Sequence, residues 1–118
     1  MSQFPSPKTF LPKTISSGKI RINILEVNTL LDFRGKKTYM IAYNIEDYEG
    51  SRPIVTGVAH LFLNEPELDE KELARLSPTE RRKLYEETFI KKLKEELMDA
   101  VRLYRANRDA FRRMTATR

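Results

Sequence analysis

The chain has 118 residues, of which 40% are hydrophobic and 33% are charged, a composition typical of a folded domain rather than a disordered segment. This length allows one core of modest size, so we expect a single domain over residues 1–118. The absence of cysteine excludes disulfides and thiolate chemistry, and the single histidine, His60, cannot form a histidine-based metal site. The formal net charge of +5 predicts an acidic partner, with nucleic acid first among the candidates.

The sequence shows no sign of membrane insertion or secretion. No apolar run approaches the ~20 residues that a membrane-spanning helix needs. The opening stretch "MSQFPSPKTFLPKTISSG" lacks the basic and apolar regions of a secretory signal. We therefore expect a cytoplasmic protein without membrane contact, including the case of a component of a virion or ribonucleoprotein particle.

Residues 1–18 are predicted to form an extended arm, because their prolines fix φ and remove backbone donors. Two interpretations stay open: the arm packs along its own domain, or it docks on a neighbouring subunit. The side chains that would make either contact are Phe4, Phe10 and Leu11.

Residues 19–63 contain three segments with the patterning of β-strands. In "KIRINILEV" the alternation slips at Leu25 and Val27, which predicts a β-bulge or a change of the buried face. The second segment, "KKTYMIAYNI", alternates regularly, whereas "PIVTGVAHLFL" is apolar on both faces and is expected centrally or covered on both sides. Turn residues in "DFRG" and "EDYEGSRP" join the segments, so we expect a three-stranded antiparallel β-meander.

Residues 64–77 carry five acids against two basic residues and are predicted to be a short acidic helix or linker. The stretch "SPTE" that begins at Ser77 is typical of a capping box, with Pro78 at the first helical position and Glu80 returning a bond to the cap. No Gly or Pro follows, so the sequence predicts one long amphipathic helix over residues 78–118.

Apolar residues recur along this predicted helix at seven-residue intervals, in a single stripe. A helix from Pro78 to about Met114 is roughly 55 Å long, against ~33 Å for a ten-residue strand, so the helix should kink or overhang the sheet. Apolar surface beyond the sheet predicts self-association, to which the arm would add. On the helix, the residues expected at an oligomer contact are Leu97, Tyr104 and Phe111.

The end of the helix is rich in arginine, with six arginines against one acid, Asp109, from Arg102 onward. Arginine binds phosphate well because its planar fork donates two parallel hydrogen bonds. The alternative is a solvated face whose basic end complements the helix dipole. The residues predicted to contact phosphate on this helix are Lys94, Arg102, Arg105, Arg108, Arg112 and Arg113.

A second basic cluster lies at the predicted hairpin between the first two strands. Aromatic residues beside basic ones on a sheet can stack on bases while phosphates are held, although tyrosine is also ordinary in strands. The residues of this cluster are Arg34, Lys36, Lys37, Tyr39 and Tyr43.

The stretch "GKIRINILEV…FRGKKTYMIAYNIEDYEGSRPI" resembles the first half of an OB-fold, as in the OB domains of bacterial replicative polymerases. The resemblance covers about 45 residues and implies that the hairpin cluster is the nucleic-acid face. No strand candidates follow Asn64 to close such a barrel, and a double-stranded-RNA-binding domain is a further analogy that lacks its leading helix here.

Catalytic patterns are absent from the sequence. The acids Glu46, Asp47 and Glu49 fit an ordinary turn, and His60 is expected to be a packed strand residue. We therefore expect no enzyme activity, no metal or cofactor and no small-molecule substrate. The sequence predicts an α+β protein that binds DNA or RNA without catalysis, or alternatively a structural or assembly protein.

Overall fold

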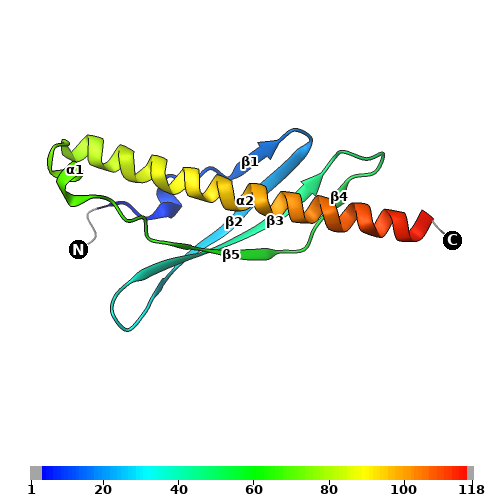
Figure 1. The fold of residues 1–118 in the computed structure, drawn as a ribbon, viewed down its shortest axis with the longest axis horizontal. Coiled ribbons are helices and arrows are strands. Elements are labelled where there is room, and N and C mark those ends of the chain that lie inside the picture. The colour runs from blue at the N-terminus through cyan, green and yellow to red at the C-terminus, as the bar shows by residue number, and fades with distance from the viewer. Residues whose placement is uncertain (1–3, 117–118) are drawn as a thin grey trace.

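The computed structural model describes the backbone of residues 4–116 and the side chains of residues 4–114. Its architecture is α+β: an antiparallel five-stranded sheet lies against one long C-terminal helix, α2 (Pro78–Ala116), as Figure 1 shows. The longest dimension is 62 Å, close to the length of about 58 Å expected for such a helix. The helix therefore sets the long axis of the molecule.

The sheet is built around β3 (Lys37–Asp47), which has strand partners on both of its edges. On one edge it pairs with β2 (Ile20–Leu31), which in turn pairs with β1 (Thr14–Ser17). On the other edge it pairs with β4 (Ile54–Val55) and with β5 (Ala59–Asn64). All of these pairings are antiparallel.

The predicted number of three strands is wrong. The arm contributes β1, and the third predicted segment divides into β4 and β5, which pair with different parts of β3. That segment also lies at an edge of the sheet rather than at its centre. The strand order β1-β2-β3-β4 is an open meander, so the barrel closure of an OB-fold is not present in the described residues.

Local sequence signals explain the shape of the β2–β3 hairpin. The predicted bulge is confirmed, because the register of β2 against β3 shifts between Ile24 and Glu26. At the tip, one carboxylate oxygen of Asp32 accepts the N–H groups of Arg34 and Lys36, both at 2.8 Å. Gly35 has φ of +79°, a left-handed conformation that glycine adopts without steric cost.

The core lies between α2 and one face of the sheet. The helix presents side chains at four-residue spacing that are at most 1% exposed, and they pack against isoleucines and tyrosines of β2 and β3. This spacing replaces the predicted seven-residue stripe, of which Leu97 is buried but Phe111 is 66% exposed. The buried helix residues are Tyr85, Phe89, Leu93, Leu97 and Val101.

The start of α2 is the capping box that the sequence predicted. The hydroxyl of Ser77 accepts the N–H of Glu80, and the N–H of Ser77 donates to the Glu80 carboxylate, both at 3.2 Å. The acidic segment before it contains one short helix, α1 (Glu70–Ala74), capped by Asp69.

The arm packs along its own domain. It is not extended throughout, because it forms a turn of 3-10 helix at Pro7–Thr9 as well as β1. The ring of Phe4 stacks on Tyr85 with centroids 4.3 Å apart, and Phe10 meets Phe89 edge-on at 5.7 Å. Leu11 also packs against the core, so all three predicted contact residues of the arm have intramolecular contacts.

Candidate nucleic-acid interface

The arginine-rich end of α2 lies beside the acidic loop that joins β3 to β4 (Figure 1). The carboxylate of Glu49 accepts Nε and Nη2 of Arg105, at 3.1 and 3.0 Å, and Nη1 of Arg108 at 2.7 Å. Nη1 of Arg108 also donates to Asp47 at 2.8 Å, and its Nε donates to Asp109 at 3.0 Å. Two of the arginines predicted to bind phosphate therefore already bind carboxylates of the same chain.

Asp47 is the centre of this cluster and is 1% exposed. Its carboxylate accepts the Tyr104 hydroxyl at 2.6 Å and the N–H of Glu49 at 2.9 Å, in addition to Arg108. Burial alone would raise the pKa of Asp47, but these hydrogen bonds and the charge of Arg108 outweigh burial and lower that pKa to about 2. We refer to Asp47, Glu49, Tyr104, Arg105 and Arg108 as the loop–helix latch.

The latch corrects the expectation that Tyr104 lies beyond the reach of the sheet, because its hydroxyl is bound to the last residue of β3. It also reduces the positive charge at this end: among residues 102–116, five arginines and Asp109 give +4, and the carboxylates of Asp47 and Glu49 lower this to +2. Arg112 lies over the same loop, since a Cβ added at Gly50 would be 3.0 Å from its Nη2. From the sequence, Asp47 and Glu49 were interpreted as ordinary turn residues. Their pairing with arginines of α2 was therefore not predicted.

The remaining predicted helix residues are exposed. Lys94 and Met98 lie where two hollows of about 380 and 500 Å³ adjoin, and the first of these is bounded by β1. Arg102 contributes to the second hollow but pairs with Asp99 at 3.3 Å. Carboxylates line this groove as well as basic groups, so its charge is mixed. Arg113 is exposed on the last turns of α2.

The hairpin tip keeps its basic side chains at the surface. Arg34 and Lys36 are exposed, Lys37 is half-buried, and none of the three forms an ion pair with the described residues. The guanidinium of Arg34 lies 5.2 Å from the ring centroid of Phe33, which is itself 91% exposed. This tip therefore combines an accessible positive charge with an accessible aromatic ring.

Tyr39 and Tyr43 face α2 and are not accessible to a base. Tyr39 is 2% exposed and Tyr43 is 9% exposed. The hydroxyl of Tyr39 donates to Glu65 at 2.6 Å, and Tyr85 donates to the same carboxylate. Burial first, and then the bond to Glu65, raise the pKa of Tyr39 to about 12. These tyrosines stabilise the core, and we leave both out of the interface.

An aromatic side chain that was not predicted from the sequence lies on the face of the sheet away from α2. Phe62 of β5 is 59% exposed, and its neighbour His60 is exposed rather than packed. The signal was present in the two-sided apolar pattern of "PIVTGVAHLFL", which predicted a central position or a cover on both sides. No such cover is formed by the described residues, so the pattern marks an exposed apolar surface.

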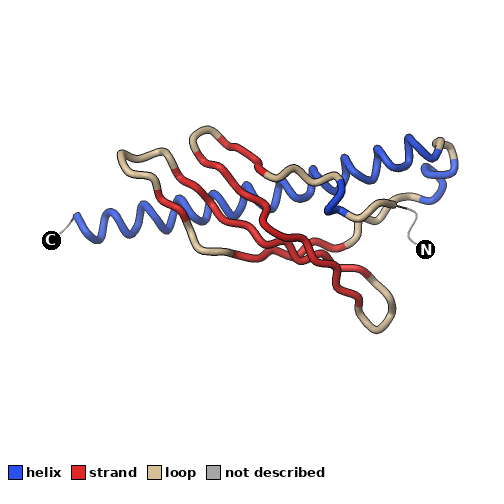
Figure 2. The backbone as a smooth tube through the Cα atoms, turned by 180° about the vertical axis from the view of Figure 1, so that it is seen from behind, coloured by secondary structure: helices blue, strands red, loops and turns tan. Residues whose placement is uncertain are grey.

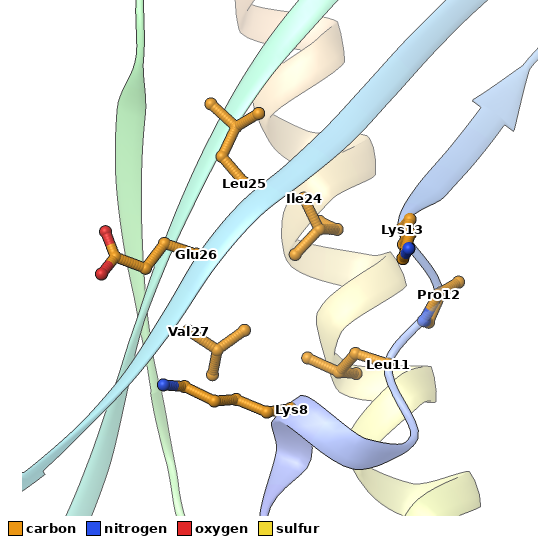
Figure 3. Close-up of a pocket in the computed structure, with 8 residues that line it drawn as sticks. All are labelled: Lys8, Leu11, Pro12, Lys13, Ile24, Leu25, Glu26 and Val27. Carbon is orange, nitrogen blue, oxygen red and sulfur yellow. The ribbon is translucent and has the colours of Figure 1, made fainter.

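A hollow of about 240 Å³ lies between the arm and β2, just before the start of β1 and beside the bulge (Figure 3). Leu11, Ile24 and Val27 point into it from both sides, whereas Leu25 and Glu26 of the bulge point away. Lys8, Lys13 and Glu26 border it beside these apolar side chains, and we assign no small ligand to this mixed lining.

No helix in the described part of the chain is long and apolar enough to cross a membrane. Within the same residues, no group of three His, Cys, Asp or Glu side chains is placed to hold a metal ion. No protein-family model matches this chain, and no match was found among the curated proteins or among the solved structures.

Proposed function

We propose that this protein binds nucleic acid without catalysis and contacts phosphates mainly through the β2–β3 hairpin. The observation that carries the proposal is the hairpin tip, where Arg34, Lys36 and Lys37 lie within four positions and make no ion pair with the described residues. The net charge of +5 supports the same class of partner.

The helix has a smaller part in this proposal than its arginine content suggests. Arg105 and Arg108 hold the loop acids, and a phosphate would have to displace those carboxylates before binding them. Lys94, Arg102 and Arg113 are exposed and can add phosphate contacts along the flank of α2. We place them second because acids lie beside two of them.

Phosphate contacts give binding a characteristic salt dependence. Each neutralised phosphate releases condensed counterions, so the logarithm of the affinity falls with the logarithm of salt concentration, by about 0.7–0.9 per contact. Because the hairpin carries no base-reading motif, the phosphate term should dominate, and weak sequence preference is expected.

The test compares two triple alanine variants that remove the same charge. One replaces Arg34, Lys36 and Lys37, and the other replaces three exposed basic residues in α1, at its C-cap and at the start of α2. Affinity for a fluorescent oligonucleotide is measured at several salt concentrations. The hairpin variant should lose most of its affinity and reduce the salt slope by about two to three. The residues of the control variant are Lys71, Arg75 and Arg82.

Two results would contradict this proposal. Absence of binding by the unmodified protein at ~50 mM salt would exclude a phosphate-binding role of the usual strength. Equal losses in the two triple variants would show that net charge alone, and not the hairpin, determines affinity.

The runner-up is an assembly protein that uses the end of α2. It is favoured by three exposed apolar side chains there: Leu103 is 64% exposed, Phe111 66% and Met114 72%. The arm contributes less to this alternative than the sequence suggested, because its aromatic rings pack on Tyr85 and Phe89. Sedimentation tests it: a Leu103→Glu variant should dissociate any oligomer, and a monomer at high micromolar concentration would count against self-assembly.

A further inference from the structure

One face of the sheet is left uncovered by the helices of residues 4–116. Seen from behind in Figure 2, the strands lie in front of α2, and no helix crosses them. From Tyr39 to Asp47 the odd-numbered residues of β3 are buried on the side of α2, so the even-numbered residues and their cross-strand partners point to the opposite side. We call this surface the open face, and its rows are Asn64, Thr38 and Leu30; Phe62, Met40 and Asn28; His60, Ala42 and Glu26; Asn44, Asn23 and Thr14.

Phe62 provides an aromatic ring in the second row of the open face. It is 59% exposed, and none of the ring–ring contacts among the described residues includes it. Its cross-strand partner Met40 is half-buried, and Leu30 in the next row is 43% exposed. A flat ring on an apolar floor is the arrangement on which a nucleobase stacks.

Uncharged polar side chains lie on both sides of this ring, and one carboxylate, that of Glu26, lies in the row between Phe62 and the asparagine pair. In the row nearer the hairpin, the Thr38 hydroxyl donates to the Asn64 side-chain oxygen at 3.3 Å. On the other side of Phe62, beyond the row of His60, Ala42 and Glu26, the Asn23 amide donates to that of Asn44 at 2.9 Å. Amides and hydroxyls both donate and accept, so they can bond the edges of any base. The open face can therefore stack and hydrogen-bond bases without requiring one sequence.

The basic hairpin is continuous with the open face, because both are made from β2 and β3. Leu30 and Thr38 form the row next to the hairpin, and Arg34 and Lys36 lie at its tip. A polynucleotide, which has flat bases and regularly spaced negative phosphates, complements an aromatic surface that lies beside a basic hairpin. An apolar protein partner would match Phe62 but not the adjoining positive charge.

The stacking geometry selects between single strands and duplexes. In a duplex the faces of the bases are covered by their neighbours in the stack, and only their edges are exposed in the grooves. An unpaired base can turn its face to an aromatic ring. Phe62 stands on a sheet surface, not on an element shaped to enter a groove.

We infer that the open face binds the unpaired bases of a single-stranded nucleic acid, with Phe62 stacking on a base while the hairpin holds the phosphates. This inference rests on the proposed nucleic-acid function and adds that the ligand is single-stranded. It assigns Phe62 a role in binding, whereas Tyr39 and Tyr43 on the face toward α2 stabilise the core.

The experiment compares a fluorescent oligothymidine of about 15 nucleotides with a duplex of mixed sequence and equal length, by anisotropy at low salt. Three variants are measured with the unmodified protein: Phe62→Ala, Phe62→Trp and the matched control Phe111→Ala. Phe111 is a similarly exposed phenylalanine at the far end of α2. Far-ultraviolet circular dichroism checks that each variant is folded.

The single strand should bind about tenfold or more tightly than the duplex, and Phe62→Ala should lose about tenfold in single-strand affinity. Phe62→Trp should keep that affinity, and Phe111→Ala should leave it unchanged. Equal affinity for the two ligands, or equal effects of Phe62→Ala and Phe111→Ala, would overturn the inference while leaving phosphate binding by the hairpin intact. Absence of binding to both ligands would overturn the proposed function and this inference together. A dimer that dissociates in Phe62→Ala without any change in affinity would show that a second copy covers the face, and would also overturn it.

Discussion

Replacement of Asp47 by Asn tests the loop–helix latch with little change in side-chain shape. The carboxylate of Asp47 accepts three hydrogen bonds, from Tyr104, Arg108 and the N–H of Glu49, in a site that is 1% exposed. The amide removes the charge that balances Arg108 and supplies a donor where the carboxylate oxygens only accepted. We expect the variant to fold with a lower free energy of unfolding.

The lowered pKa gives the size of the effect. The pKa of Asp47 falls from 3.8 to about 2 in the folded protein. A difference of nearly two pKa units corresponds to about 2–3 kcal/mol of stability at neutral pH. Because the folded-state pKa is the lower one, this stability is fully present above the unfolded pKa and is lost as pH falls from about 4 to about 2.

Urea denaturation at about pH 7 and about pH 3 measures both the loss of stability and its dependence on pH. Asp47→Asn should lower the free energy of unfolding by about 2–3 kcal/mol at neutral pH, and the difference from the unmodified protein should shrink by about half at pH 3. The matched control is Asp99→Asn, whose exposed pair with Arg102 should contribute under ~1 kcal/mol. A loss no larger than that of the control, or one independent of pH, would refute the latch as a charge-linked stabilising contact.

Three further predictions concern the helix start and the tyrosines. Ser77→Ala should lower the free energy of unfolding by about 1 kcal/mol without changing nucleic-acid affinity, and an unchanged melting temperature would show that the capping box does not stabilise α2. Phe4→Ala should expose Tyr85 and increase proteolysis of the arm, and equal cleavage of both proteins would contradict docking of the arm. The pKa values of Tyr39 and Tyr104 are raised to about 12, chiefly by burial, so titration by ultraviolet absorbance should leave at least two of the five tyrosines un-ionised at about pH 11 until urea is added. Since these folded-state pKa values are the higher ones, the stability they confer should be lost as pH rises from about 10 toward 12, and ionisation of all five tyrosines by about pH 11 in the folded protein would contradict this.

The features predicted correctly from the sequence depend on residues close together in the chain. The bulge near Leu25 was visible because a strand has a period of two, and a single extra residue reverses the alternation. Ser77 and Glu80 identified the start of α2 because both bonds of a capping box join residues three positions apart. The errors in the sheet arose from pairing: β4 and β5 came from one segment, and nothing local shows that its two parts pair with different stretches of β3.

The candidate site was predicted less well, because accessibility depends on the whole fold. The sequence marked Arg34, Lys36 and Tyr39 as one cluster, but the alternation of the strand placed Tyr39 on the buried face. It missed Phe62, whose two-sided apolar segment has the same pattern whether its outer face is covered or exposed.

The sequence by itself determined the order and type of most elements, the turn at Gly35 and the length of α2, because these follow from backbone sterics, periodicity and short-range hydrogen bonds. Only the tertiary structure decided which charges are available to a ligand. Arg108 and Asp47 are 61 positions apart, and they meet because α2 crosses the sheet at an angle that brings its last turns to the end of β3. Once the two are in contact away from water, the arginine and the carboxylate stabilise each other. A side chain that the sequence marks as a phosphate ligand thus becomes part of the structural framework, while the hairpin tip and the open face, which have no partner element in the described residues, are left exposed.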